Sequence, residues 1–441
     1  MSLYNKDSIV ALATARGVGA LSIVRVSGGL ASKIFKALTD IKKIRPRYAY
    51  YCSIKSRDNY ILDDVVIIFY KGPKSFTGED SFEISCHGGE IIANNIINEI
   101  IGQGCRYAYP GEFSKRAVLN GKINIQKAEA LNNAIKATSS LSANKGLVGL
   151  EGDAKKLLEE ARKKTVRLLA TIEHELDFVE GEINETTDSF FEKMLDGAIT
   201  PLKEVADGTL AGNKLKNGFR VALIGPPNAG KSTLFNSILG YNKSIISSKK
   251  GTTRDSLEVF VEVNGVPIEL IDTAGYWEVV DELDALAVEK TLATIQNSDV
   301  LIIVDDKNPM FFSSKINLFG KPCIFVKSKC DNSNKIISNK KTIHLSAHLR
   351  TNIDTLLTAL STLIKTSFLE ENIFICSLRQ ASLIDKALDA LVSLRATFQK
   401  LDLVQRVSGL RYASENLFDV YGEISNNDVF DNVFNDFCVG K

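Results

Sequence analysis

Hydrophobic and polar positions divide the chain into segments of different character. Between residues 1 and 120, short β-rich runs such as Ala20–Val26, Val65–Phe69 and Ser81–Cys86 alternate with glycine-containing turns. Short apolar runs bounded by turn residues are typical of strands. We therefore expect residues 1–120 to form a compact α+β domain.

Helical periodicity replaces this pattern after Ile123. Within Lys155–Val179, apolar side chains recur every three or four positions, and Glu, Lys and Arg occupy the opposite side. The same spacing returns after residue 372 with Ile384, Leu388, Leu391, Leu394 and Phe398. Such spacing gives a helix one apolar face, which must pack against a partner. We predict that residues 121–215 and 371–441 are two halves of one helical domain.

Residues 216–370 alternate apolar strands with helices. The runs FRVALIG, DVLIIVDD and KPCIFVKS lack polar alternation, which is typical of strands buried in a parallel sheet. Asn264-Gly265 separates Leu257–Val263 from Val266–Ile271, and this turn predicts an antiparallel hairpin at the edge of the sheet. The α/β domain would thus be inserted between the two helical segments.

Composition places the chain among ordinary globular proteins. Its 441 residues include 54 Lys and Arg against 53 Asp and Glu, a net charge of +1. This balance disfavours unaided binding of nucleic acid and leaves RNA contact to a local patch or to a second protein. The seven cysteines are never spaced as CxxC, and the longest apolar run, about six residues, is far shorter than the roughly 20 that a membrane span needs. We expect a cytoplasmic protein without a membrane span.

A phosphate-binding loop follows the first strand of the α/β domain. Gly225–Ser232 reads GPPNAGKS and precedes a helix-like segment, so the GxxxxGK[ST] motif stands in its strand–loop–helix context. In such a loop, backbone N–H groups and the helix N-terminus bind the β-phosphate. Lys231 would span the β- and γ-phosphates, and Ser232 would coordinate Mg²⁺.

Two further motifs are typical of nucleoside triphosphate hydrolases that switch between states. Asp272 begins the sequence DTAG at the end of the hairpin, where its carboxylate can hold Mg²⁺ through water and the Gly275 N–H can reach the γ-phosphate. Thr253 lies in GTTRD, between the phosphate loop and the hairpin. We expect its hydroxyl to be the second Mg²⁺ ligand from a switch loop.

The predicted base-reading residues follow two later strands. Ser328-Lys329-Cys330-Asp331 stands where guanine-binding proteins usually have Asn-Lys-x-Asp, and Ser346-Ala347 follows the next strand. The Asp331 carboxylate can accept from both guanine N1–H and the 2-amino group, so a preference for GTP should survive the change to Ser328. An ATPase is the alternative that Ser328 suggests, and Asp331 with Ser346-Ala347 opposes it.

Several long motifs resemble one family of GTPases. GTTRD with Asn228 in the phosphate loop, DSIVALATARGVGALSIVRVSG at 7–28, PKSFTGEDSFEISCHGG at 73–89, YPGEFSKRAVLNGKINIQKAEA at 109–130 and the terminal CVGK are similar to the MnmE (TrmE) family of bacterial tRNA modification GTPases. The resemblance covers essentially the whole chain. It implies an N-terminal folate-binding and dimerisation domain over 1–120, a discontinuous helical domain, and an inserted Ras-like P-loop G domain.

The resemblance also implies a reaction and its partners. Members of this family form homodimers and act with an MnmG-like flavoprotein, as a heterotetramer, on the wobble uridine of tRNA. They attach an aminomethyl or carboxymethylaminomethyl group at C5, using the one-carbon unit of a formyl- or methylene-tetrahydrofolate. GTP hydrolysis needs Mg²⁺ and K⁺, while FAD and NADH enter only through the partner.

Site residues carry over from the family motifs by position. The K⁺ ligands would be Asn228, Ser247, Lys249 and Thr252, and the folate contacts would be Arg25, Glu83, Lys122 and Lys441. The catalytic residues would be Cys438 and Asp284, which stands where the family has a Glu that orients the attacking water. Motifs and resemblance together give the GTP-binding set Asn228, Ala229, Gly230, Lys231, Ser232, Thr233, Ser247, Thr252, Thr253, Asp272, Thr273, Ala274, Gly275, Ser328, Lys329, Asp331, Ser346 and Ala347.

Other interpretations of these residues stay open at this point. Without the resemblance, Arg25 reads as a solvated strand end and Cys438 as an inert residue of a helical tail. A regulatory GTPase that binds rRNA or the ribosome without modifying RNA is the main alternative function. It predicts a basic or β-rich RNA-binding appendage, whereas this chain has a folate-like N-terminal region and a terminal Cys-x-Gly-Lys.

Overall fold

The chain forms two compact units. The computed structural model describes residues 7–177, 188–241, 245–247, 257–273, 282–331, 342–369, 372–421, 434 and 437–440. The first unit contains residues 1–128 and 421–441, and the second contains residues 129–420. The division into 1–120, 121–215, 216–370 and 371–441 expected from the sequence stays a prediction.

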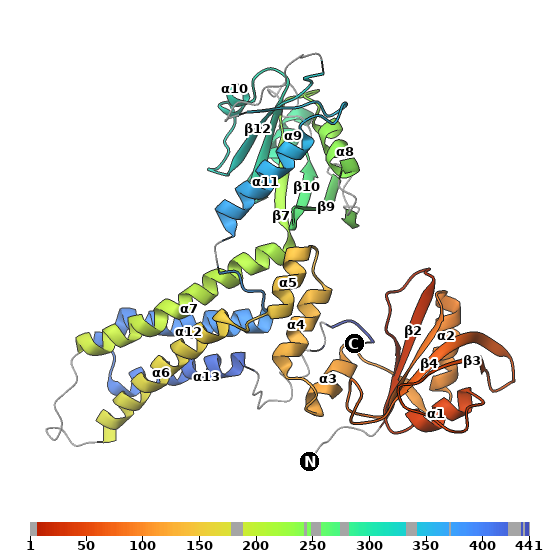
Figure 1. Cartoon of the computed structure of the whole chain (residues 1–441). Helices are drawn as coiled ribbons and strands as arrows, with labels where there is room; N and C mark the ends of the chain where they lie inside the picture. The colour runs from red at the N-terminus through yellow and green to blue at the C-terminus, as the bar shows by residue number, and fades with distance from the viewer. Residues whose placement is uncertain are drawn as a thin grey trace. The chain divides into compact units, whose positions relative to one another are not determined.

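The first unit contains a mixed six-stranded sheet. Its strands are β1 (Ser8–Leu12), β2 (Leu21–Ser27), β3 (Ala49–Lys55), β4 (Ile61–Tyr70), β5 (Ser81–His87) and β6 (Cys105–Tyr107). They lie in the order β3-β4-β5-β2-β1-β6, and only β1 and β6 pair in parallel. Helices α1 (Ala31–Leu38) and α2 (Glu90–Ile101) bury their apolar sides against this sheet (Figure 1). The α+β fold expected from the alternating short runs is confirmed.

A small hydrophobic cluster on β1 packs the C-terminal residues against the rest of the first unit. Helix α3 (Glu112–Leu119) contributes Phe113, which packs with Ile9, Ala11 and Ala108 against Val439. Helix α4 (Ile125–Ile135) contains the boundary between residues 128 and 129. The C-terminal residues 437–440 therefore belong to the folded N-terminal unit.

Four long helices form the helical part of the second unit. They are α6 (Asp153–Asp177), α7 (Asp188–Asn217), α12 (Leu378–Thr397) and α13 (Leu403–Val420), and α6 packs on α7 and α13 while α12 packs on the same two. The shorter α5 (Ser140–Val148) and a 3₁₀ turn, Phe398–Lys400, complete it. The apolar stripe predicted after residue 372 is confirmed, since Ile384, Leu391 and Leu394 are buried. Two distant segments thus build one helical domain.

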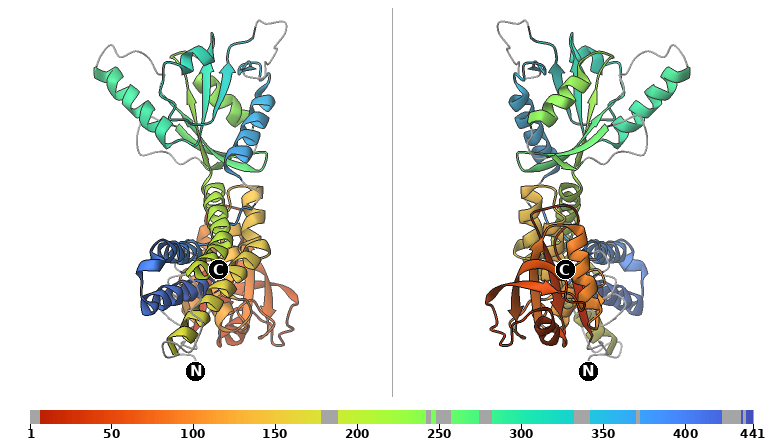
Figure 2. Two further views of the ribbon diagram at one scale, coloured as in Figure 1. Left: turned by 90° about the vertical axis from the view of Figure 1, so that its left-hand side faces the viewer. Right: turned by 90° about the vertical axis from the view of Figure 1, so that its right-hand side faces the viewer.

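The α/β part of the second unit has three layers. Its strands are β7 (Phe219–Ile224), β8 (Ile245–Ser247), β9 (Leu257–Val263), β10 (Val266–Asp272), β11 (Val300–Asp305), β12 (Cys323–Lys327) and β13 (Ile343–His344), in the order β13-β12-β11-β7-β10-β9-β8. Helices α8 (Lys231–Tyr241) and α11 (Ile353–Phe368) cover one face, and α9 (Glu282–Asn297) and α10 (Pro309–Ser313) cover the other (Figure 2). The inserted α/β domain is confirmed.

The predicted hairpin is present, but it is not the edge of the sheet. β9 and β10 pair antiparallel around Asn264-Gly265, as the turn sequence indicates. The short β8 pairs with the outer side of β9 and is the edge strand. Three residues are too few to show an alternating pattern, so the sequence contained no signal for this strand.

Among the residues that the structure describes, none of the helices combines the length and apolar character needed to cross a membrane.

Candidate functional site

The phosphate loop lies between β7 at the centre of the sheet and α8. A Cβ atom on Gly225 would lie 2.0 Å from the Val304 carbonyl oxygen, so this position needs glycine. Gly230 and Asn228 have positive φ angles of 89° and 61°, which turn the loop back on itself. Lys231 Nζ donates to the carbonyls of Gly225 at 3.1 Å and Pro226 at 2.9 Å. The ammonium group is therefore held inside the curve of the loop.

The charges at this loop fit a nucleotide with a divalent cation. Lys231 is 6% exposed, and burial lowers the pKa of its ammonium while Asp272 opposes that effect. Asp272 Oδ1 is buried and accepts no hydrogen bond from any described residue. A buried carboxylate oxygen without a donor is costly unless a cation or water meets it. Asp272 and the exposed Ser232 hydroxyl therefore fit the Mg²⁺ predicted beside the phosphates.

Ser328 connects the base-reading loop to the phosphate loop. Its hydroxyl donates to the Ala229 carbonyl at 2.6 Å, and its backbone N–H donates to Asp305 at 3.0 Å. Lys329 forms an ion pair with Asp306 at 3.1 Å. The Ser328 hydroxyl, at a position where the motif usually has Asn, therefore bonds directly to the phosphate loop.

Asp331 and the loop after β13 also lie together. The Ser346 hydroxyl donates to Asp331 Oδ1, and the Leu349 N–H donates back to the Ser346 hydroxyl at 3.0 Å. On the far side of this loop, Ser237 of α8 donates to the Ala347 carbonyl at 2.6 Å. Ser237 was not predicted, because a serine on a helix next to a phosphate loop carries no signal of its distant partner.

For the remaining residues predicted to bind the nucleotide or a cation, the structure describes some side chains, some backbone positions alone, and some residues not at all. Thr273 is 8% exposed and donates to the Leu223 carbonyl at 2.6 Å, whereas Thr233 is exposed on α8. Ser247 ends β8 and Asp284 lies in the first turn of α9, but the description of these two residues does not extend to their side chains. Lys249, Thr252, Thr253, Ala274 and Gly275, and Lys441 of the folate set, lie outside the described residues.

Arg25 and Glu83 form a second polar site in the first unit. They are directly opposite each other on the antiparallel strands β2 and β5. Arg25 Nε and Nη2 lie 2.9 and 2.8 Å from Glu83 Oε1, and Tyr70 Oη donates to Glu83 Oε2 at 3.4 Å. Both charged side chains are about a quarter exposed, at 24% and 28%. The Arg25–Glu83 pair is therefore accessible to solvent, and part of its hydrogen-bonding capacity is already used within the protein.

The end of the chain reaches this pair. Arg25 Nη1 donates to the Gly440 carbonyl at 3.3 Å, and the Gly111 N–H donates to the Cys438 carbonyl at 3.2 Å. A Cβ atom on Gly440 would lie 2.2 Å from the Leu12 carbonyl oxygen. Cys438 itself is exposed. The predicted folate residues Arg25 and Glu83 and the predicted catalytic cysteine thus belong to one folded region.

Aromatic side chains that the sequence reasoning missed surround Arg25. Its guanidinium lies 5.4 Å from the ring centre of Phe76 and 5.7 Å from that of Phe113. Phe76 is 40% exposed. Lys122 is exposed, and its aliphatic stem lies beside Gly78 of the loop that carries Phe76. An exposed aromatic ring beside a carboxylate and cations suits a planar, hydrogen-bonding ligand.

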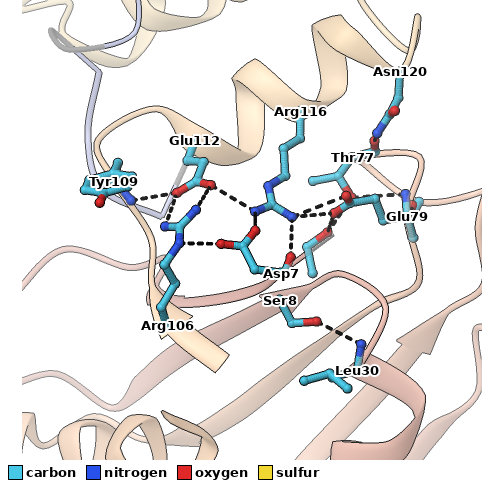
Figure 3. Close-up of polar contacts among 12 residues, drawn as sticks. Asp7, Ser8, Leu30, Thr77, Glu79, Arg106, Tyr109, Glu112, Arg116 and Asn120 are labelled. Carbon is cyan, nitrogen blue, oxygen red and sulfur yellow. Dashed lines mark hydrogen bonds and ion pairs between the residues drawn. The ribbon is translucent and has the colours of Figure 1, made fainter. Parts of the chain in front are cut away.

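A network of charged side chains, centred on the buried Arg116 and Glu112, holds the two sides of this region (Figure 3). Arg116 of α3 bonds to Asp7 and to Glu79 of the loop that carries Phe76, and both Arg116 and Arg106 bond to Glu112. Burial would raise the pKa of Glu112, but hydrogen bonds from Arg106, the Tyr109 N–H and Arg116 outweigh it and lower that pKa. The network therefore fixes the loop of Phe76 to the helix whose first turn contacts the C-terminal residues.

The phosphate loop on β7 and α8, the acidic end of β10 and the Asp331 loop define a P-loop GTPase of the α/β class. The family models "GTP-binding protein TrmE N-terminus" and "MnmE helical domain" match residues 8–122 and 125–438. The tRNA modification GTPase MnmE of Sulfurovum sp. is 32% identical over 99% of both chains, and that of Helicobacter acinonychis is 35% identical over 99% of this chain and 100% of its own. The chain belongs to the MnmE family of tRNA modification GTPases.

Parts of this chain are also similar to solved structures. Era of Aquifex aeolicus, bound to GDP·AlF4⁻, is 26% identical with a TM-score of 0.28, over 39% of this chain and 66% of its own. The G domain of the FeoB iron transporter of T. maritima is 22% identical with a TM-score of 0.27, over 33% of this chain and 98% of its own.

Proposed function

We propose that this GTP hydrolase of tRNA modification couples K⁺-assisted GTP hydrolysis to the attachment of an aminomethyl or carboxymethylaminomethyl group at C5 of the wobble uridine. It would act as a homodimer with an MnmG-like flavoprotein, which brings FAD and NADH. A formyl- or methylene-tetrahydrofolate would supply the one-carbon unit. The four-segment domain division of the chain is part of this proposal.

One observation carries the proposal beyond a nucleotide switch. Arg25, Glu83 and the exposed Cys438 belong to one folded region although Cys438 is at the other end of the chain. A carboxylate accepts from the N–H and NH₂ edge of a pterin, and cations bind a glutamate tail. The Glu83 pair therefore fits a folate, which a regulatory GTPase that only binds RNA does not need.

In the nucleotide site, the described residues support roles in GTP and Mg²⁺ binding. Lys231 would turn from the loop carbonyls to the phosphates, and Asp272 and Ser232 would hold Mg²⁺. We assign Asn228, Ser247, Lys249 and Thr252 to K⁺ and Asp284 to the attacking water by position in the family motifs. A monovalent cation there would stabilise the transferring phosphoryl group as an arginine finger does.

Reconstitution tests the proposal. The full-length chain, an MnmG-like flavoprotein with FAD and NADH, tRNA with an unmodified wobble uridine, GTP with Mg²⁺, the folate, and ammonium or glycine as the source of the amine nitrogen are mixed, and the nucleoside is identified by mass spectrometry. We expect modification in KCl with folate, and loss of both hydrolysis rate and modification in NaCl. Glu83→Gln should abolish saturable folate binding by calorimetry and leave GTP hydrolysis unchanged, because Glu83 is in the other unit.

Three outcomes would contradict the proposal. Equal hydrolysis rates in KCl and NaCl would reject the K⁺ mechanism. Modification that proceeds equally without folate, or equal folate binding by wild type and Glu83→Gln, would reject the assignment of the Arg25–Glu83 site.

A further inference from the structure

Positive charge is concentrated on one part of an otherwise neutral chain. Between residues 31 and 75, ten Lys and Arg stand against four Asp and no Glu, although the whole chain has a net charge of only +1. This segment covers α1, the loop 39–48, β3 and β4 of the first unit, and β3 is the edge strand of the sheet (Figure 1). The excess charge is thus local to α1, the loop 39–48 and the first two strands of the sheet order.

Four lysines of this segment line one hollow, called here the basic hollow. Lys36, Lys42, Lys43 and Lys71 surround a space of about 290 Å³. The only carboxylate that lines it, Asp80, is already bonded to Lys71 at 2.7 Å and to the Gly72 N–H at 2.9 Å. No carboxylate of the described residues pairs with Lys36, Lys42 or Lys43. These three charges are therefore available to a ligand.

The loop 39–48, which carries Lys42 and Lys43, has a backbone held by hydrogen bonds, whereas Lys36 lies on α1. Tyr50 Oη accepts from the Arg45 N–H at 2.8 Å and donates to the Lys43 carbonyl at 3.3 Å. Arg47, with a φ of 61°, donates its N–H to Phe69 at 2.8 Å and its guanidinium to the Lys74 carbonyl at 2.9 Å. Lys42 and Lys43 thus extend from an ordered loop and Lys36 from a helix, which lowers the entropy lost on binding.

An exposed aromatic ring follows Lys42 and Lys43 in the loop 39–48. Tyr48 is 50% exposed, its ring lies 4.8 Å from that of Tyr50, and the Arg45 guanidinium lies 5.3 Å above it. Proteins bind unpaired RNA bases by stacking them on such rings, beside cations that contact the phosphates. The combination favours a single-stranded loop of RNA over a purely anionic surface. A second copy of the same face is disfavoured because like charges would meet.

We propose that the basic hollow and Tyr48 form a docking surface for the tRNA, with Lys36, Lys42 and Lys43 on backbone phosphates and Tyr48 under an unpaired base. The proposal rests on the proposed function, because tRNA is the polyanion on which that function acts. The first unit would then bind the RNA directly, through a surface separate from both the phosphate loop and the Arg25–Glu83 pair.

The test compares two triple variants of the full-length chain. Lys36→Ala/Lys42→Ala/Lys43→Ala removes three charges from the hollow, and Lys156→Ala/Lys163→Ala/Arg167→Ala removes three exposed charges from α6 as a matched control. Binding of tRNA is followed by fluorescence anisotropy over a range of salt concentrations. We expect the hollow variant to bind about tenfold or more weakly and its salt slope to fall by about 2 to 3, since each lost phosphate contact removes roughly 0.7 to 0.9 from that slope. The control should bind as wild type does.

Tyr48→Ala provides a second, independent arm. It should weaken binding of an anticodon stem-loop and leave binding of a double-stranded RNA of the same length unchanged. GTP hydrolysis without RNA should be equal in all variants, so a failed RNA test is distinguishable from a failed GTPase or folate test. Equal tRNA affinity and salt slope in wild type and the hollow variant would overturn the proposal. If the hollow variant no longer bound the flavoprotein partner but bound tRNA as wild type does, the proposal would also be overturned, because the hollow would then be a protein interface.

Discussion

At the scale of single residues, Ser328 departs from the usual motif and joins two loops of the α/β part. The side chain is 3% exposed and its only described acceptor is the Ala229 carbonyl at 2.6 Å. This bond joins the loop predicted to read the base to the loop predicted to bind the phosphates. A neutral hydrogen bond of this kind contributes about 1 kcal/mol. The two loops are therefore coupled through one hydroxyl.

Removing that hydroxyl should weaken nucleotide binding. We expect Ser328→Ala to lower GTP affinity roughly fivefold, which corresponds to about 1 kcal/mol, because the Ala229 carbonyl loses its donor and the loop its anchor. Titration with a fluorescent guanine nucleotide measures the change. Ser314→Ala is the control, since Ser314 is exposed and bonds only within α10. Wild-type affinity in Ser328→Ala would mean that the phosphate loop is positioned without this bond.

The cysteines differ in the reactivity that their surroundings allow. Burial raises the pKa of Cys86 and Cys323 to about 11 and that of Cys105 and Cys376 to about 12. The thiolate is the reactive form, so these four remain protonated and slow at pH 8 and become reactive only as the pH rises toward those values. Cys438 is exposed.

We therefore expect iodoacetamide at pH 8 to modify Cys438 well before those four cysteines. Peptide mass spectrometry over a time course measures each site in the intact chain. Labelling of Cys323 at the same rate as Cys438 would contradict the burial argument. A Cys438→Ser variant identifies the labelled peptide without changing the fold of the C-terminal residues.

At the scale of secondary-structure elements, turns and loops set by consecutive residues could be predicted from the sequence. Contacts between residues far apart in the sequence could not. The Asn264-Gly265 hairpin and the Gly225–Ser232 loop depend on local backbone geometry, and the structure has both. Arg25 and Glu83 are 58 positions apart, and Arg25 and Gly440 are 415 apart. Only strand register and the packing of the chain end bring them together, and no periodicity reports those. The family resemblance, not the pattern, suggested that site.

Packing between α7 and the segment after α11 depends on two glycines. The Phe374 N–H donates to the Gly208 carbonyl at 3.0 Å. A Cβ atom would lie 2.6 Å from the Asn372 carbonyl oxygen at Gly208, and 2.0 Å from the Phe374 carbonyl oxygen at Gly212. Helix α7 leads into β7, and the Phe374 segment leads out of α11. The two connections of the α/β part therefore lie against each other.

A methyl group at this contact should destabilise the chain although alanine favours a helix. Gly212→Ala gains about 1 kcal/mol in helix propensity and loses about 1–3 kcal/mol by overpacking against a backbone that cannot move aside cheaply. Gly197→Ala, on the same helix, places its Cβ no closer than 3.7 Å to the flexible Lys164 side chain. We expect Gly197→Ala to raise the free energy of unfolding in urea and Gly212→Ala to lower it. A gain in both variants would show that the Phe374 segment shifts freely.

At the scale of the whole molecule, the chain passes between its two units twice, at residues 128–129 and 420–421. Arg379 bonds to both boundaries within the second unit. Its Nε and Nη2 donate to the Glu129 carboxylate, each at 3.0 Å, and its Nη1 and Nη2 donate to the Asp419 and Val420 carbonyls at 2.7 and 3.5 Å. Ser377 also donates to Glu129 at 2.7 Å. One guanidinium thus ties the first residues of this unit to its last.

Removal of either the Glu129 or the Arg379 charge should therefore lower the free energy of unfolding strongly. Removal of both charges should lower it much less. The Glu129 side chain is 2% exposed and that of Arg379 is 14% exposed, so Arg379→Met leaves a buried carboxylate without its cation. Breaking a buried pair from one side costs about 3–5 kcal/mol, whereas replacing both partners by apolar residues of similar size is often close to neutral. We expect Arg379→Met to lower the free energy of unfolding by that amount and Glu129→Met/Arg379→Met to recover most of it. Urea unfolding of the two single variants and the double variant gives the coupling energy directly. If Arg379→Met unfolds at the wild-type urea concentration, or if the two single effects simply add, the boundaries are held by helix packing alone and the guanidinium is dispensable.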